Sequence, residues 1–150
     1  MESSLKEAIQ QAAQRLAQHQ QQVDAKANLP IEPGDVVLTN IEWLVVREVD
    51  DITLLVPIDD HWMVGAADVK LEEPMVARCG HGLWVNSKSL TPSMRCRIIK
   101  EEDLSKVRKL LGELARGILS PSSPIDDDPN YWELCDKLDG LREEAETLLT

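Results

Sequence analysis

The sequence predicts a mainly β protein, in which a small antiparallel barrel over residues 33–100 carries one helix before it and two helices after it. Within these limits, short Val-rich apolar runs are interrupted every few residues by Asp, Gly, Pro or Asn. Such runs and breaks are typical of short antiparallel strands joined by tight turns. The flanking segments instead repeat apolar residues at spacings of three and four, which is the period of an amphipathic helix.

The composition favours a folded chain and argues against a nucleic-acid partner. Apolar residues make up 43% of the 150 residues, which is enough for a hydrophobic core, although aromatic residues are scarce and Phe is absent. The formal charge of −11 is concentrated in residues 121–150, which hold nine acidic residues against two basic ones. Proteins that bind nucleic acids need clustered Lys and Arg, so we do not expect a nucleic-acid partner.

Three scattered cysteines indicate a reducing environment. Cys79, Cys96 and Cys135 form an odd set without a C-x-x-C pair, which is the pattern of free thiols rather than of a disulfide framework. The N-terminus has no charged-then-apolar leader, and no apolar run is long enough to span a bilayer. We therefore expect a cytoplasmic protein that makes no membrane contact.

Residues 1–28 are predicted to form an amphipathic arm, helical from Ser3 to about Ala27. Ser3 or Ser4 is the expected N-cap, because Glu7 follows Ser4 at capping-box spacing. A heptad seam on this helix contains Leu5, Ile9, Ala12, Leu16, His19 and Val23. Such a helix is marginal in isolation, so the seam is expected to dock on the barrel or to pair with another chain, as in a homodimer.

Residues 29–119 are predicted to form the barrel and its closing helix. Strands are expected over residues 36–39, 43–49, 53–58, 67–71, 75–78, 83–85 and 94–99. Connections of about two residues between the first three strands favour hairpins. In the last strand, Met94, Cys96 and Ile98 alternate with Arg95, Arg97 and Ile99, which predicts one buried face.

Two helices are predicted after the barrel. The first runs from Glu101 to Arg116 and is ended by Gly117. A linker over residues 120–128 leads to an acidic helix over residues 129–150, for which Asp128 is the expected N-cap and Pro129 the first helical residue. This last helix repeats a heptad-like stripe that includes Leu134, Leu138 and Leu141. The two heptad-like helices of the chain are expected to pair within it or across a dimer.

Several segments of the barrel follow a known order. Gly34-Asp35 opens an apolar strand, two further apolar strands cover residues 43–46 and 53–58, and residues 85–90 precede a strand and the helix that begins at Glu101. Over residues 33–117 this order resembles the PemK/MazF family, the toxin halves of toxin–antitoxin pairs. The resemblance implies an SH3-like barrel, dimerisation, and an antitoxin-like protein or peptide partner lying across the barrel surface.

Most members of that family are ribonucleases that cut single-stranded RNA, with an Arg at the end of the first loop and a Thr or Ser after strand three. At the matching positions this chain has Asn40-Ile41-Glu42 and Asp59-Asp60. Two carboxylates repel a phosphate rather than hold it. We therefore expect a non-catalytic interaction module without catalytic residues. The alternative is a divergent, metal-independent endoribonuclease that uses Arg47 or Arg78 in place of the missing Arg.

Four charged residues are the candidate binding residues. Asp59 and Asp60 stand in a turn, whereas Arg95 and Arg97 form, with Lys100, a small basic edge that suits an acidic partner segment. Carboxylates in a turn serve most often just to form that turn.

Cys79, His81 and His61 suggest zinc ligands or a nucleophile with its base. The four-ligand spacing of a structural zinc site is missing, and nothing completes a catalytic triad. We therefore expect no metal and no cofactor.

Overall fold

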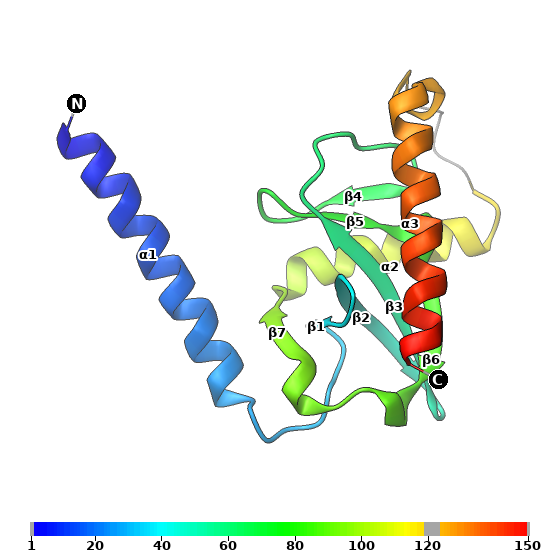
Figure 1. Cartoon of the computed structure of the whole chain (residues 1–150), viewed down its shortest axis with the longest axis horizontal. Coiled ribbons are helices and arrows are strands. Elements are labelled where there is room, and N and C mark those ends of the chain that lie inside the picture. The colour runs from blue at the N-terminus through cyan, green and yellow to red at the C-terminus, as the bar shows by residue number, and fades with distance from the viewer. Residues whose placement is uncertain (1, 119–123, 150) are drawn as a thin grey trace.

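The computed structural model describes residues 2–118 and 124–149. Its elements are α1 (Glu2–Ala25), β1 (Asp35–Leu38), β2 (Glu42–Val49), β3 (Ile52–Asp59), β4 (Asp68–Lys70), β5 (Val76–Arg78), β6 (Leu83–Asn86), β7 (Arg95–Ile98), α2 (Glu101–Ala115) and α3 (Pro129–Leu148). Each strand and helix predicted from the sequence is present (Figure 1). Short 3-10 turns add η1 (Cys79–His81) and η4 (Pro124–Asp127), among others.

The strands form one open antiparallel sheet. The strand order is β4-β5-β3-β2-β1-β7, and the two predicted hairpins β1–β2 and β2–β3 are both formed. The outer edge of β3 is shared, because Ile52–Leu55 pair with β6 whereas Ile58 and Asp59 pair with β5. Within the described ranges, the end strands β4 and β7 do not pair with each other, so the closure expected of a barrel is not observed.

Two helices cover opposite faces of this sheet, with α3 in front of it and α2 behind it in Figure 1. Successive residues of a strand point to opposite faces, so the central strands supply two apolar clusters. The cluster under α2 includes Val36, Leu44, Val56, Leu104 and Val107, and the cluster under α3 includes Val37, Trp43, Leu55, Ala145 and Leu149. The central strands are therefore buried on both sides.

The apolar stripe of α3 packs against the sheet and not against α1. Leu138 is buried, and Leu134 and Leu141 are half-buried. The amide of Asn40 donates to the Leu141 carbonyl at 2.8 Å, which fixes the helix to the β1–β2 turn. Figure 1 shows α1 beyond the β7 edge of the sheet and α3 across its front face, so the two helices do not pair within the chain.

The helix ends confirm most of the predicted capping. Gly117 has a φ of 71°, and the amides of Gly117 and Ile118 donate to the carbonyls of Leu114 and Glu113 in a Schellman arrangement. Asp128 caps α3 by accepting from the amide of Asn130 at 2.9 Å.

The N-cap predicted for the first helix is wrong, because α1 begins at Glu2 and therefore includes Ser3 and Ser4. Part of the predicted linker, residues 119–123, lies outside the described residues.

Candidate functional site

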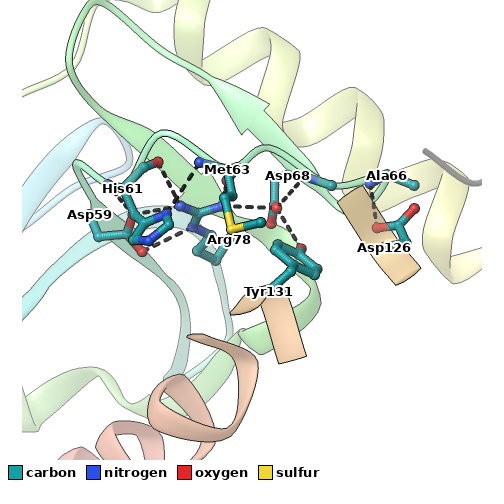
Figure 2. Close-up of polar contacts among 9 residues, drawn as sticks. Asp59, His61, Met63, Ala66, Asp68, Arg78, Asp126 and Tyr131 are labelled. Carbon is teal, nitrogen blue, oxygen red and sulfur yellow. Dashed lines mark hydrogen bonds and ion pairs between the residues drawn. The ribbon is translucent and has the colours of Figure 1, made fainter. Parts of the chain in front are cut away.

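Arg78, the last residue of β5, is fully buried and stands at the centre of a polar cluster that we call the Arg78 network (Figure 2). Its Nε and Nη2 donate to the two oxygens of Asp59 at 2.9 and 2.7 Å, and its Nη1 donates to Asp68 at 2.9 Å. The carbonyls of His61 and Met63 accept the remaining hydrogens. Since a guanidinium has five N–H groups, every donor of Arg78 is used.

Asp68 extends the network from the sheet to α3. The same carboxylate oxygen that faces Arg78 accepts from the amide of Gly65 at 2.7 Å and from the phenol of Tyr131 at 2.6 Å. One step further, the amide of Ala66 donates to Asp126 of η4 at 3.1 Å. Figure 2 shows these groups in a row, so β3, β5, the loop between β3 and β4, and α3 are joined through one arginine.

The electrostatics of the Arg78 network keep Arg78 charged, and its donors are all occupied by protein acceptors. Burial lowers the pKa of Arg78, but the hydrogen bonds and charges of Asp59 and Asp68 outweigh this effect and raise the pKa above its ordinary value. Burial, together with Asp68, also raises the pKa of Tyr131. Asp59, a predicted binding residue, is thus the counter-ion of a buried arginine, whereas its neighbour Asp60 is exposed. No donor of Arg78 is left to hold a phosphate.

A second cluster, the Arg95 network, fixes the segment that leads from α1 into the sheet. The buried side chain of Arg95 lies 3.0 Å from Asp35 and donates to the carbonyls of Lys26, Leu29 and Pro30. The ammonium of Lys26 approaches the same Asp35 carboxylate to 2.6 Å. Burial lowers the pKa of Lys26, but its bonds and charge interactions with Asp35 and Glu32 raise it overall.

The predicted buried face of the last strand is therefore wrong at its first residues. Arg95 is buried and Cys96 is exposed, because Asp35 on the adjacent β1 draws the guanidinium inward. Arg97 is half-exposed and pairs with Glu42 at 3.2 Å. The predicted basic edge thus reduces to Arg97 and Lys100. Asp59 and Asp60 lie at the end of β3, so the four candidate binding residues do not form one site.

The thiol and imidazole groups singled out in the sequence are separate from one another. Cys79 is buried, and burial together with the charge of Asp68 raises its pKa to about 12. The Nδ1 of His81 lies 2.9 Å from Asp139 of α3, and that of His61 accepts from the amide of Met63 at 3.2 Å. Among the described side chains, no three His, Cys, Asp or Glu residues gather closely enough to hold a metal ion.

An apolar groove of about 580 Å³, which we call the α2 groove, lies between the second half of α2 and strands β2, β3 and β6. Its lining comprises Val46, Arg47, Leu54, Cys79, Gly80, Trp84, Arg108, Leu111, Gly112, Leu114 and Ala115. The sequence pattern suggests Arg47 only as a substitute catalytic residue and does not predict the groove. One signal was available, since a glycine inside a helix costs about 1 kcal/mol relative to alanine and Gly112 interrupts the amphipathic pattern of α2.

No protein family, no curated protein and no solved structure matches this chain. None of the described helices is both long and apolar enough to cross a membrane.

Proposed function

We propose that the chain is a cytoplasmic, non-catalytic interaction module that self-associates through α1, built on a degenerate SH3-like sheet of PemK/MazF type. The resemblance rests on the sequence pattern of residues 33–117, and the sheet that these residues form is antiparallel and open. The three cysteines are free thiols, which agrees with a reducing compartment. A toxin–antitoxin origin of the module rests on the resemblance alone.

The observation that carries the proposal is the orientation of α1. The hollow between α1 and the sheet is lined on the helix side mostly by polar residues, among them Gln18, Gln22 and Lys26, and it also includes His19 of the seam. Because each helical residue is turned by about 100° from the previous one, Leu5, Ile9 and Leu16 lie roughly a third of a turn away from that face. Leu5, Ile9 and Leu16 are accordingly 64%, 60% and 71% exposed.

This arrangement is unusual for a helix of a monomeric protein, which normally buries its apolar stripe against its own core. Here the chain anchors the C-terminal part of α1 near β7, with His19 and Val23 half-buried, and leaves Leu5, Ile9 and Leu16 of the heptad seam in solvent. A seam of that period pairs best with another helix of the same period. The α1 helix of a second copy supplies one, so the proposed partner is a second copy of this chain.

The engagement of Arg78 supports the non-catalytic part of the proposal. The endoribonuclease alternative uses Arg47 or Arg78 in place of the missing loop Arg. All five N–H groups of Arg78 donate to protein acceptors. An arginine that stabilises a reacting phosphate must aim free donors at it. The endoribonuclease alternative therefore depends on Arg47, which is exposed in the α2 groove.

Light scattering coupled to size exclusion tests the self-association. The intact chain should have twice its mass of 16.8 kDa, and the triple variant Leu5→Gln, Ile9→Gln, Leu16→Gln should have the monomer mass. A matched control, Gln10→Ala, Gln14→Ala, Gln21→Ala, changes the opposite face of α1 and should stay dimeric. An intact chain that is monomeric at high concentration refutes pairing with a second copy.

Incubation with single-stranded RNA tests the non-catalytic part. We expect no sequence-selective cuts, with or without a chelator. Cuts that disappear in Arg47→Gln but persist in the control Arg97→Gln would establish the endoribonuclease alternative instead.

A further inference from the structure

The α2 groove differs in charge from the rest of this acidic surface. Two of its lining residues are arginines and none is acidic. The four other hollows described on the surface each contain a glutamate: Glu48, Glu146, Glu133 and Glu72. The last of them, beside α1, also contains Arg15, Lys26 and Lys100, and its Lys26 is already paired with Asp35. In a chain with a formal charge of −11, a hollow with two arginines and no acidic lining residue is a local site for a negatively charged group.

One of the two cations is held in position. The Nε and Nη2 of Arg108 donate to the carbonyl of Val46 at 3.1 and 3.0 Å, which leaves Nη1 without a role in this anchor. Arg47 faces the groove from the opposite wall, at the register shift between β2 and β3. A side chain that is fixed before binding loses less conformational entropy when a partner arrives.

The apolar surface continues past the groove along the same face of the sheet. Trp84 pairs with Leu54 in the strand register, and Ile52, two residues before Leu54, points the same way. Val49 is opposite Ile52 in the β2–β3 pairing. Trp84, Ile52 and Val49 are 46%, 45% and 43% exposed. A ligand that covers both the groove and this strip has to be longer than a small molecule.

We infer that the α2 groove binds an acidic amphipathic segment of a partner protein, with apolar side chains against Trp84 and Leu54 and carboxylates paired with Arg47 and Arg108. This surface lies on α2 and is distinct from the seam of α1, so the inference does not depend on self-association. A nucleic acid suits the groove less well. Its many phosphates meet the net negative field of the chain, and only two groove arginines oppose them.

Synthetic peptides of defined pattern test the inference by fluorescence anisotropy at physiological salt. The probe is a fluorescein-labelled helical peptide with leucines at positions i, i+3, i+4 and i+7 and glutamates between them. A second peptide carries serines in place of the leucines. Because the protein and the probe are both anionic, binding of the leucine–glutamate peptide requires a local cationic site. The serine–glutamate peptide should bind at least about tenfold more weakly.

Two variants test whether the peptide binds in the α2 groove. Arg47→Gln with Arg108→Gln removes the cations, and Gly112→Leu fills the groove while replacing glycine by a better helix former. Each variant should bind the leucine–glutamate peptide about tenfold or more weakly than the unmodified protein does. The matched controls are Arg142→Gln, at an exposed arginine of α3, and Gly140→Leu. Gly140 lies on α3 with open space around it, so both controls should leave binding unchanged.

The outcomes separate this inference from the proposed function. The monomeric α1 triple variant should still bind the peptide, whether or not the intact chain dimerises. The inference is overturned if the peptide does not bind, or if the groove variants bind it as well as the controls do. It is also overturned if the protein binds fluorescein-labelled oligouridylate instead of the peptide, and if the double arginine variant no longer binds that RNA.

Discussion

The phenol oxygen of Tyr131 lies 2.6 Å from the carboxylate of Asp68, and this bond attaches α3 to the buried arginine of the sheet. Tyr131 is the sole tyrosine of the chain, so spectroscopy can follow this contact without interference from another phenol. The acceptor oxygen also receives hydrogens from Arg78 and from the amide of Gly65. Docking of the last helix thus depends on one carboxylate that serves three donors.

Tyr131 should not ionise near the ordinary tyrosine pKa of about 10 while the protein is folded. Burial, and then Asp68, raises its pKa, so the folded state holds the phenol proton more tightly than the unfolded state. The stability that this group contributes is complete below pH about 10 and is lost as the pH rises above it. Phenolate absorbance should therefore appear together with the loss of circular dichroism. Tyr131→Phe is the blank, and a phenolate signal from folded protein near pH 10 would contradict the assignment.

Replacing Arg78 by lysine should lower the free energy of unfolding by about 3–5 kcal/mol, because an ammonium cannot reach all the acceptors and leaves buried carboxylates without a partner. Urea denaturation measures the loss. Arg97→Lys is the control, because its half-exposed pair with Glu42 should contribute less than about 1 kcal/mol. Equal stability of the two variants would show that Arg78 is not a structural centre.

Gly65→Ala should detach the start of α3. A Cβ at this position would lie 2.5 Å from the Asp126 carboxylate and 2.6 Å from the Tyr131 phenol oxygen, so both must move. Amide hydrogen exchange in α3 should then become faster. Gly140→Ala, whose Cβ meets open space, is expected to slow exchange slightly because alanine favours the helix. Unchanged α3 protection in Gly65→Ala would rule out this close contact.

Two truncations should separate the seam of α1 from its anchor. Removing residues 1–17 deletes Leu5, Ile9 and Leu16 but spares the Arg95 network, so the mass should fall to that of a monomer while the melting temperature of the monomer stays unchanged. Removing residues 1–28 also deletes the Lys26 carbonyl and ammonium that contact Arg95 and Asp35. The longer truncation should therefore melt at a lower temperature, and identical melting curves would show that the Arg95 network does not stabilise the sheet.

The order of elements could be predicted because it depends on local patterns. Val-rich runs between turn residues placed the seven strands, and the Asp128-Pro129 pair placed the start of α3. The layering could not be predicted, since a buried strand that packs on both faces lacks the alternation of a half-exposed one. The expected barrel therefore gives way to an open sheet between two helices.

The functional features depend on contacts between distant residues, which a single sequence does not reveal. Arg108 meets Val46, and Tyr131 meets Asp68, across long stretches of chain. The local pattern around Arg95 even pointed the wrong way, because an arginine next to a cysteine in a strand suggests an exposed cation. Its burial follows only from the position of Asp35 on the neighbouring strand.

The covering of Trp43 by α3 has a consequence for synthesis on the ribosome. Trp43, Val45 and Leu55 belong to the first half of the chain, yet the residues that shield them, Ala145 and Leu149, are made much later. At about 5–20 residues per second, translation leaves this apolar sheet face without its cover for several seconds. During that interval the nascent chain exposes apolar side chains, which chaperones that act beside the ribosome can bind.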